Sequence, residues 1–361
     1  MLIVDFTQTP QNIPFVKVLG LTVAERHALA AQSAGCDEVL FVMPGATLKQ
    51  AQDVVEKHPR LKIPVGFTDT MPHAASNAWI LSGDIILTSQ GMKGLMDGTY
   101  NMAAMPGKYK STVTAENVGP VETTLLKSLV KDADGVVSRN INRKISLFIS
   151  KRLARYSVVP NQVTAVVFLI GILSGPLAFF MNSYWGFTLG ALCYYVSAIL
   201  DGCDGEISRL KYLGSPFGAW MDTVVDDLVG LSYILGLYGR LALDTDSMLW
   251  TVVGATTISM YMLTILPRYW VMARNGSGDF QKLAAQKKPK EIRGFMKVVE
   301  GVRNVIFRTD FLPFFAFVTA ASGFVLAFAI PFAAGSLASA IDSIIDTIRV
   351  KKIVAAKTVA P

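Results

Sequence analysis

The sequence predicts two parts of different fold class, a soluble α/β domain followed by an all-α membrane domain. Hydrophobic residues make up 52% of the 361 residues and charged residues only 17%, which is too apolar for an ordinary soluble enzyme. The apolarity is uneven, because residues 1 to about 137 resemble a soluble protein, whereas long apolar runs begin at Pro160. We therefore expect a soluble domain over 1–137, a connecting helix over 138–158 and a membrane domain over 159–361.

Strand-like runs alternate with helical stretches in the first part. Such alternation favours a parallel sheet covered by helices. The expected strands lie in "EVLFVM" at 38–43, "IPVGF" at 63–67 and "WILSGDIILTS" at 79–89, and the expected helices lie at 22–35 and 47–58.

The connecting segment predicts a basic amphipathic helix on the membrane surface. Its apolar residues follow helical spacing, and basic residues occupy the positions between them, a pattern typical of helices held by lipid headgroups. The alternative is a charged linker helix packed on the soluble domain. The apolar residues are Ile141, Ile145, Phe148, Ile149 and Leu153, and the basic residues are Arg139, Arg143, Lys144, Lys151, Arg152 and Arg155.

Six apolar runs are close to the length needed to cross about 30 Å of hydrocarbon. The last two runs share one apolar stretch, which we expect to divide near Pro331. Basic residues concentrate before the first run, after the second, in the 274–308 loop and at 349–352, so both termini and the loop after the second run are expected in the cytoplasm of an inner-membrane protein. The predicted spans are 160–181, 184–200, 216–238, 248–272, 311–328 and 330–348.

Four aspartates lie at the facing ends of the second and third predicted spans. Asp201 and Asp204 are three residues apart and Asp222 and Asp226 are four apart, so each pair shares one helix face. One unpaired carboxylate at the bilayer centre costs roughly 2.5–3.5 kcal/mol, and two divalent cations such as Mg²⁺ would neutralise such a cluster. The alternative is four interfacial acids that reach into water.

The acid spacing resembles the signature of the CDP-alcohol phosphotransferase family. The pattern is Asp201-x-x-Asp204-Gly205-x-x-Ser208-Arg209, then eight residues, then Gly218-x-x-x-Asp222-x-x-x-Asp226. Ser208 stands where the family usually has alanine. The resemblance implies a six-helix membrane domain, two bound Mg²⁺ or Mn²⁺ ions, and a homodimer without a nucleic-acid partner.

The resemblance also implies roles for individual residues. Asp201, Asp204 and Asp222 would hold the metals, while Asp226 would ligate the second metal and act as general base on the acceptor hydroxyl. The donor would be a CDP-alcohol, and CMP would leave with its charge held by metal and arginine. The residues implied in donor binding are Asn161 and Thr164 of "PNQVT", Gly205, Ser208, Arg209 and Gly218.

The first part resembles a cytidylyltransferase, as in the family branch that fuses an inositol-phosphate cytidylyltransferase to a di-inositol-phosphate-phosphate synthase. "GLTVAERHALAAQSAGCDEVLFVM" fits an early helix and strand of that fold, and "SGDIIL" fits the strand with a metal-binding acid. The Gly-rich loop that would hold the CTP phosphates is absent before Gly20. We therefore expect an inactive, degenerate nucleotidyltransferase domain with a docking or regulatory role.

The substrates stay open at this stage. Di-inositol phosphates are solutes of hyperthermophiles, but the low charge content and 14 methionines are unlike hyperthermophile proteins, so a phospholipid product is equally consistent. An acceptor that carries a phosphate would need basic residues to bind it, and five basic residues are candidates. The alternative is that these residues only reflect the excess of positive charge on the cytoplasmic side of a membrane protein. They are Lys151, Arg152, Arg155, Arg268 and Arg274.

Two other classes of function compete with an enzyme. A transporter would place cation-binding acids near the bilayer midplane within internally repeated halves, whereas these acids lie near one interface and no second copy of the motif is present. A catalytically silent membrane anchor for the first domain would have lost acidic positions, and all four are intact.

Overall fold

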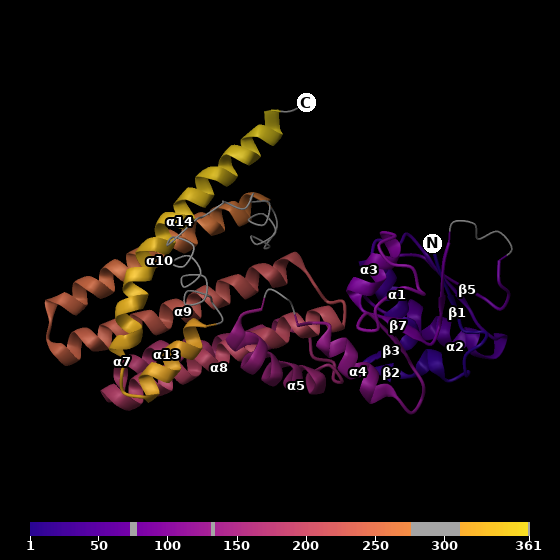
Figure 1. The fold of residues 1–361 in the computed structure, drawn as a ribbon, viewed down its shortest axis with the longest axis horizontal. Helices are drawn as coiled ribbons and strands as arrows, with labels where there is room; N and C mark the ends of the chain where they lie inside the picture. The colour runs from indigo at the N-terminus through magenta and orange to yellow at the C-terminus, as the bar shows by residue number, and fades with distance from the viewer. Residues whose placement is uncertain (73–77, 131–133, 276–310, 360–361) are drawn as a thin grey trace. The chain divides into compact units, whose positions relative to one another are not determined.

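The computed structural model describes residues 1–72, 78–130, 134–275 and 311–359, which are shown in Figure 1. The described chain forms two compact units that interleave along the sequence. The first comprises Met1–Ala133, Leu147–Val159 and Gly205–Leu213, and the second comprises Asp134–Ser146, Pro160–Asp204 and Gly214–Pro361. The domain boundaries expected after 137 and 158 stay predictions.

A four-stranded parallel sheet organises the first unit. Its order is β5-β4-β1-β6, and Leu2 of β1 pairs in parallel with Val39 on one side and Trp79 on the other. The sequence predicted three of these strands but not β1, which is central. The strands are β1 (Leu2–Asp5), β4 (Val39–Val42), β5 (Val65–Thr68) and β6 (Trp79–Ser82).

Helices and two small antiparallel sheets complete the first unit. The α1 helix begins with a capping box, in which Thr22 and Glu25 each accept a hydrogen bond from the other's backbone N–H, a strong helix-start signal. The helices are α1 (Val23–Ser33), α2 (Gly45–Glu56), α3 (Ser89–Met96), α4 (Val118–Lys127) and the short η1 (Ile13–Phe15); the sheets pair β2 (Lys17–Val18) with β3 (Leu21–Thr22) and β7 (Ile85–Leu87) with β8 (Lys110–Thr112).

The hydrophobic core of the first unit includes residues from far along the chain. Val4, Phe41 and Leu81 on the sheet are fully buried, and the same cluster contains Ala154 and Leu210. The sheet domain therefore shares its core with two later segments, one that the sequence alone assigned to the connecting helix and one that it assigned to the membrane domain.

The second unit is helical, and a helical segment corresponds to each of the six predicted spans. Four of these segments are long and apolar enough to cross a membrane among the described residues: Pro160–Phe180, Tyr184–Leu210, Met248–Trp270 and Leu326–Ile345. The segments are α6 (Pro160–Ile172) with α7 (Ser174–Phe180), α8 (Ser183–Leu210), α9 (Pro216–Thr245), α10 (Met248–Asn275), α13 (Leu312–Ala321) and α14 (Leu326–Val359). The protein is thus a membrane protein, and the count of six spans stays a prediction.

The division of the last apolar stretch differs from the expectation. Helix α13 ends at Ala321, and Gly323 adopts a left-handed conformation with φ +78°, which glycine adopts at little cost. Pro331 lies inside α14, so the predicted break at Pro331 is wrong. A proline in a helix removes one backbone hydrogen bond, but it need not end a membrane helix.

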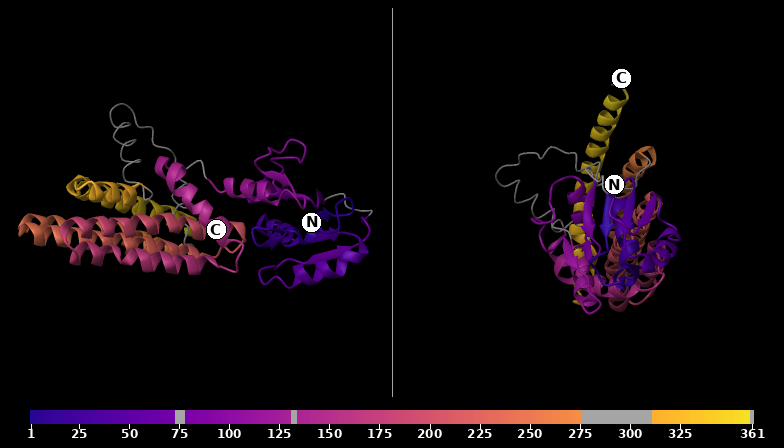
Figure 2. Two further views of the ribbon diagram at one scale, coloured as in Figure 1. Left: turned by 90° about the horizontal axis from the view of Figure 1, so that it is seen from below. Right: turned by 90° about the vertical axis from the view of Figure 1, so that its right-hand side faces the viewer.

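Glycines let α9 lie directly against α7. A Cβ atom on Gly236 would lie 2.2 Å from the carbonyl oxygen of Gly175, and a Cβ atom on Gly175 would lie 2.2 Å from that of Ser232. Close backbone contact through small residues is the usual way in which membrane helices associate. Helix α9 also packs against α6 and α10, and α10 packs against α14; the long helices are seen lengthwise in Figure 2.

The connecting segment forms η2 (Ser138–Asn142) and α5 (Arg143–Leu153). Its buried face is small or polar and its exposed face is apolar, the opposite of a helix on the surface of a soluble protein. The buried positions recur every four residues and are small or polar, whereas apolar side chains are exposed. The buried residues are Asn142, Ser146, Ser150 and Ala154, and the exposed apolar residues are Ile141, Ile145 and Phe148.

Candidate functional site

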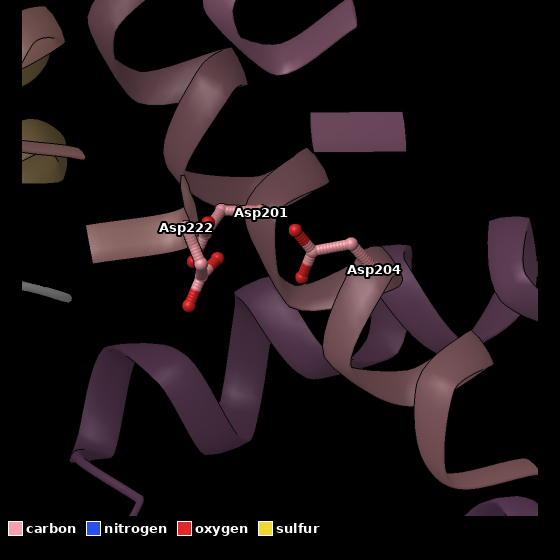
Figure 3. Close-up of side chains that lie close together, drawn as sticks. All are labelled: Asp201, Asp204 and Asp222. Carbon is pink, nitrogen blue, oxygen red and sulfur yellow. The ribbon is translucent and has the colours of Figure 1, made fainter. Parts of the chain in front are cut away.

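Helices α8 and α9 bring three carboxylates together. Asp201 and Asp204 lie on α8 and Asp222 lies on α9, and one oxygen of each carboxylate is within 4.8 Å of the others. Figure 3 shows the side chain of Asp204 extending toward the other two. This arrangement agrees with the face-sharing predicted from the spacing of the aspartates.

The three carboxylates fit a divalent cation. Oδ1 of Asp201 and Oδ1 of Asp222 are buried and have no hydrogen-bond partner among the described residues. Leaving a buried carboxylate oxygen without a partner is costly, and oxygen ligands of this kind suit Mg²⁺ or Mn²⁺. Together the three residues offer a set of hard oxygen ligands that suits a divalent cation.

Thr164 supports one of these ligands. Its hydroxyl Oγ1 is buried and lies 2.6 Å from Oδ2 of Asp204, to which it can donate a hydrogen bond. The resemblance of "PNQVT" predicted Thr164 as a nucleotide contact, which stays a prediction, and the structure shows its hydroxyl in contact with Asp204. A hydrogen bond of this kind orients a metal-binding carboxylate.

Asn161 and Gly218 lie side by side. Helix α9 begins as predicted, with Ser215 Oγ accepting a hydrogen bond from the Gly218 N–H at 3.0 Å and Pro216 as the first helical residue. A Cβ atom on Gly218 would lie 3.3 Å from Oδ1 of Asn161. The structure therefore brings together two residues that were predicted separately for donor binding.

Asp226 and Asp227 have different surroundings although they are adjacent. Asp226 is exposed and lies outside the three-carboxylate group. Asp227 is buried, and its two carboxylate oxygens each accept a hydrogen bond from Nη2 of Arg268 at 2.6 Å. The hydroxyl of Tyr269 also donates to Asp227 at 2.7 Å. The charge of Asp227 is thus compensated by its neighbours, as in a structural support.

Gly205, Ser208 and Arg209 lie at the C-terminal end of α8, within the first unit. A Cβ atom on Gly205 would lie 3.3 Å from Nη1 and 3.6 Å from Nη2 of Arg209. The guanidinium therefore lies against the bare backbone of Gly205, and a larger residue there would displace it.

The cations predicted for an acceptor phosphate differ in their partners. Arg155 and Lys151 form ion pairs with Glu122 at 2.7 and 3.6 Å, and Arg268 pairs with Asp227. The exposed Arg152 lies over the ring of Phe148, 3.7 Å from its centroid. The side chain of Arg274 and the basic loop at 276–308 lie outside the described residues.

Sequence reasoning missed Arg143 as a site residue. Its Nε donates to Asp134 at 3.0 Å, and its Nη1 lies 3.4 Å from the position of a Cβ on Gly202. Its positive charge also acts on Asp201. The sequence showed Arg143 only as one of several basic residues on an amphipathic helix, so no local signal distinguished it.

Part of the chain is similar to known proteins. Residues 157–298 match the family model described as CDP-alcohol phosphatidyltransferase. The bifunctional IPC transferase and DIPP synthase of Aquifex aeolicus is 36% identical over 38% of this chain, and its namesake in Archaeoglobus fulgidus is 40% identical over 36%. The archaetidylinositol phosphate synthase of Pyrococcus horikoshii is 32% identical over 32% of the chain. The predicted resemblance to this family and to its bifunctional branch is confirmed for the matched region, and neither the transporter nor the silent-anchor alternative is favoured.

These similarities cover part of each protein. The chain spans 31% of the Aquifex protein, 26% of the Archaeoglobus protein and 57% of the Pyrococcus protein. The match shows that the chain carries a CDP-alcohol phosphatidyltransferase domain.

Proposed function

We propose that this chain, which carries a CDP-alcohol phosphatidyltransferase domain over residues 157–298, is an integral membrane transferase. It moves a substituted phosphoryl group from a CDP-linked donor to an acceptor hydroxyl and releases CMP. The observation that supports this most strongly is the carboxylate group of Asp201, Asp204 and Asp222, whose ligand oxygens lie within 4.8 Å of one another. These residues occupy the acidic positions of the family signature.

The metal ligands in this proposal are Asp201, Asp204, Asp222 and Asp226, with two divalent cations shared among them. Bound Mg²⁺ or Mn²⁺ would neutralise the diphosphate charge and stabilise the leaving CMP. Thr164 keeps the Asp204 carboxylate in a fixed orientation through its hydroxyl. Asp226 accepts the proton of the acceptor hydroxyl, a new oxygen–phosphorus bond forms, and the bond between that phosphorus and CMP breaks.

The exposure of Asp226 supports its assignment as the base. A general base must come within hydrogen-bond reach of the acceptor hydroxyl, and an exposed carboxylate can be approached by a second substrate. The buried neighbour Asp227 is held by Arg268 and Tyr269, so it is not available for this step.

Donor binding is assigned to two groups of residues. Asn161 and Gly218 would lie against the nucleotide, since Gly218 has no side chain to fill the space beside Asn161. Gly205 and Arg209 would meet the diphosphate, because a planar guanidinium suits phosphate oxygens. Ser208 replaces a residue that is alanine in most of the family and adds one hydroxyl near this contact.

The acceptor is assigned by class, as a hydroxyl compound that can carry a phosphate. The relatives include proteins named for DIPP and for archaetidylinositol phosphate synthesis, so products of the inositol-phosphate and phospholipid classes both fit. Of the five cations predicted for the acceptor, Lys151, Arg155 and Arg268 would bind a phosphate beside the carboxylates that already pair with them. Arg152 is exposed and has no carboxylate within ion-pair distance among the described residues. Arg274 is proposed for the acceptor phosphate from the sequence alone.

We also propose the membrane arrangement. Six helices would span an inner membrane with both termini and the site in the cytoplasm, and the enzyme would act as a homodimer. The exposed apolar face of η2 and α5, with Ile141, Ile145 and Phe148, would lie in the headgroup layer. The parallel-sheet domain would be a degenerate nucleotidyltransferase-like module without cytidylyltransferase activity.

The test uses the full chain purified in lipid with Mg²⁺ or Mn²⁺. It is incubated with a panel of CDP-alcohols and of inositol, inositol phosphate and glycerol phosphate acceptors, and released CMP is measured. We expect CMP release that requires the metal, one donor class and one acceptor. An absence of metal-dependent CMP release across the whole panel, from protein that is folded and binds Mn²⁺, would refute the transferase assignment.

A further inference from the structure

The front domain, defined here as residues 1–133 of the first unit, holds the C-terminal end of α8. Leu210 is the last residue of α8 and is buried in the core that the front domain forms. The chain then turns at Tyr212, which is left-handed with φ +55°, and the Leu213 N–H donates to the carbonyl of Ser208. The end of α8 thus has a defined cap within the first unit.

Arg26 provides the most direct link in this arrangement. It lies on α1 and is only 2% exposed. Its Nη1 donates to the carbonyl of Leu210 at 3.0 Å and its Nη2 donates to the carbonyl of Val18 at 2.7 Å. The last carbonyls of a helix lack partners within the helix, so Arg26 satisfies one of them and ties it to the β2 strand.

The same helix end is held by other contacts within the first unit. The ammonium group of Lys211 donates to the carbonyl of Tyr156. Ser150 donates to the fully buried carboxylate of Glu206 at 2.6 Å. These contacts fix the end of α8 against the last turns of α5 and the segment that follows them.

That segment is in turn fixed to the front domain. Glu122 on α4 is 3% exposed and pairs with Arg155 and Lys151. Gly20, in the turn between β2 and β3, has φ +84°, and a Cβ atom there would lie 2.2 Å from the carbonyl oxygen of Ala154. Only glycine fits this close approach.

We propose that the front domain, acting through Arg26, positions Arg209 for the donor diphosphate. Arg209 directly precedes Leu210 and lies on the same helix as Asp201 and Asp204, so fixing the Leu210 carbonyl fixes the backbone that carries Arg209. This inference rests on the proposed function for the role of Arg209. The front domain would then have a positioning role in phosphoryl transfer, and this role does not require a nucleotide bound to the front domain.

The test compares Arg26→Met with Arg60→Met, the same change at an exposed arginine of the front domain. Loss of a positioning contact should raise the KM for the CDP-alcohol about tenfold while kcat and the acceptor KM change less than about threefold. Arg26→Lys retains a charged donor and should give an intermediate donor KM. Hydrogen exchange of the amides of 205–213 in the full chain should quicken in Arg26→Met and not in Arg60→Met.

Several outcomes would overturn the proposal. One is an unchanged donor KM in folded Arg26→Met. Another is a loss of activity that affects the donor and the acceptor equally and comes with a lower thermal stability, which would show a structural role alone. If Arg26→Met does not fold, Arg26→Lys decides, because an unchanged donor KM would then contradict positioning. A wild-type chain that releases no CMP would overturn the proposed function and with it the role of Arg209. The exchange data would still show whether Arg26 fixes 205–213.

Discussion

Two aspartates on α9, Asp222 and Asp227, show how the same residue type is used in opposite ways. Asp227 is buried and its charge is compensated by Arg268 and Tyr269. Asp222 lies near Asp201 and Asp204, and its Oδ1 is buried without a hydrogen-bond partner among the described residues. A compensated buried carboxylate is typical of structural support, whereas three carboxylates with oxygens within 4.8 Å of one another favour a bound cation. The surroundings of the two side chains therefore distinguish a metal ligand from a structural residue more clearly than the spacing in the sequence does.

The largest expected effect in this comparison is that of Asp222→Asn. Replacing one charged ligand should abolish transfer, by about 10²–10³-fold or more, while the protein stays folded because mutual repulsion among the carboxylates is reduced. CMP release and Mn²⁺ binding are the measurements, with Asp201→Asn as a parallel variant. Wild-type activity in either variant would contradict the metal assignment.

Asp226→Asn should separate proton transfer from metal and donor binding. A general base typically contributes about 10²–10⁴ in rate, so turnover should fall by that factor or more, since one ligand of the second metal is also lost. Donor binding, measured by equilibrium titration with a CDP-alcohol, should fall only modestly because Asp201, Asp204 and Asp222 remain. Equal loss of donor binding in Asp226→Asn and Asp201→Asn would make Asp226 another ligand and leave the base unassigned.

Asp227→Asn should have the smallest effect on chemistry and a clear effect on stability. Arg268 would keep one hydrogen-bond acceptor, the amide oxygen, but lose its countercharge, and we expect a loss of about 1–3 kcal/mol in unfolding free energy. Thermal unfolding in detergent measures this, and Mn²⁺ affinity should not change. Asp246→Asn at the exposed end of α9 is the matched control and should leave stability nearly unaltered. Loss of Mn²⁺ binding in Asp227→Asn would show that the two aspartates are not functionally distinct.

Much of the site could be predicted from local sequence, because its ligands lie on two helices close in the chain. The i, i+3 and i, i+4 spacings and the predicted spans were sufficient to place Asp201, Asp204 and Asp222 together. The roles of Thr164 and Asp227 could not be predicted. Their partners, Asp204 and Arg268, lie 40 and 41 residues away, and helix spacing carries no information at that distance.

The fold shows the same limit. Three strands of the parallel sheet were predicted, whereas β1 was not, because Asp5 interrupts its apolar run after a few residues. The break between α13 and α14 was assigned to the proline at 331 rather than to Gly323, since the sequence does not show which backbone is left-handed. The burial of Leu210 and Ala154 in the core of the front domain depends on tertiary contacts that no local pattern encodes.

The sharing of that core has a consequence for how the protein is made. Chains grow from the N-terminus at roughly 5–20 residues per second and their domains usually fold as they emerge. The front domain emerges first, yet Leu210, which completes its core, follows only after residues 134–209. During those seconds of synthesis α6, α7 and most of α8 must also leave the ribosome. We therefore expect the front domain to reach its final stability only when membrane insertion is under way, so that folding of the front domain and insertion of the helices into the bilayer are coupled steps of one biogenesis.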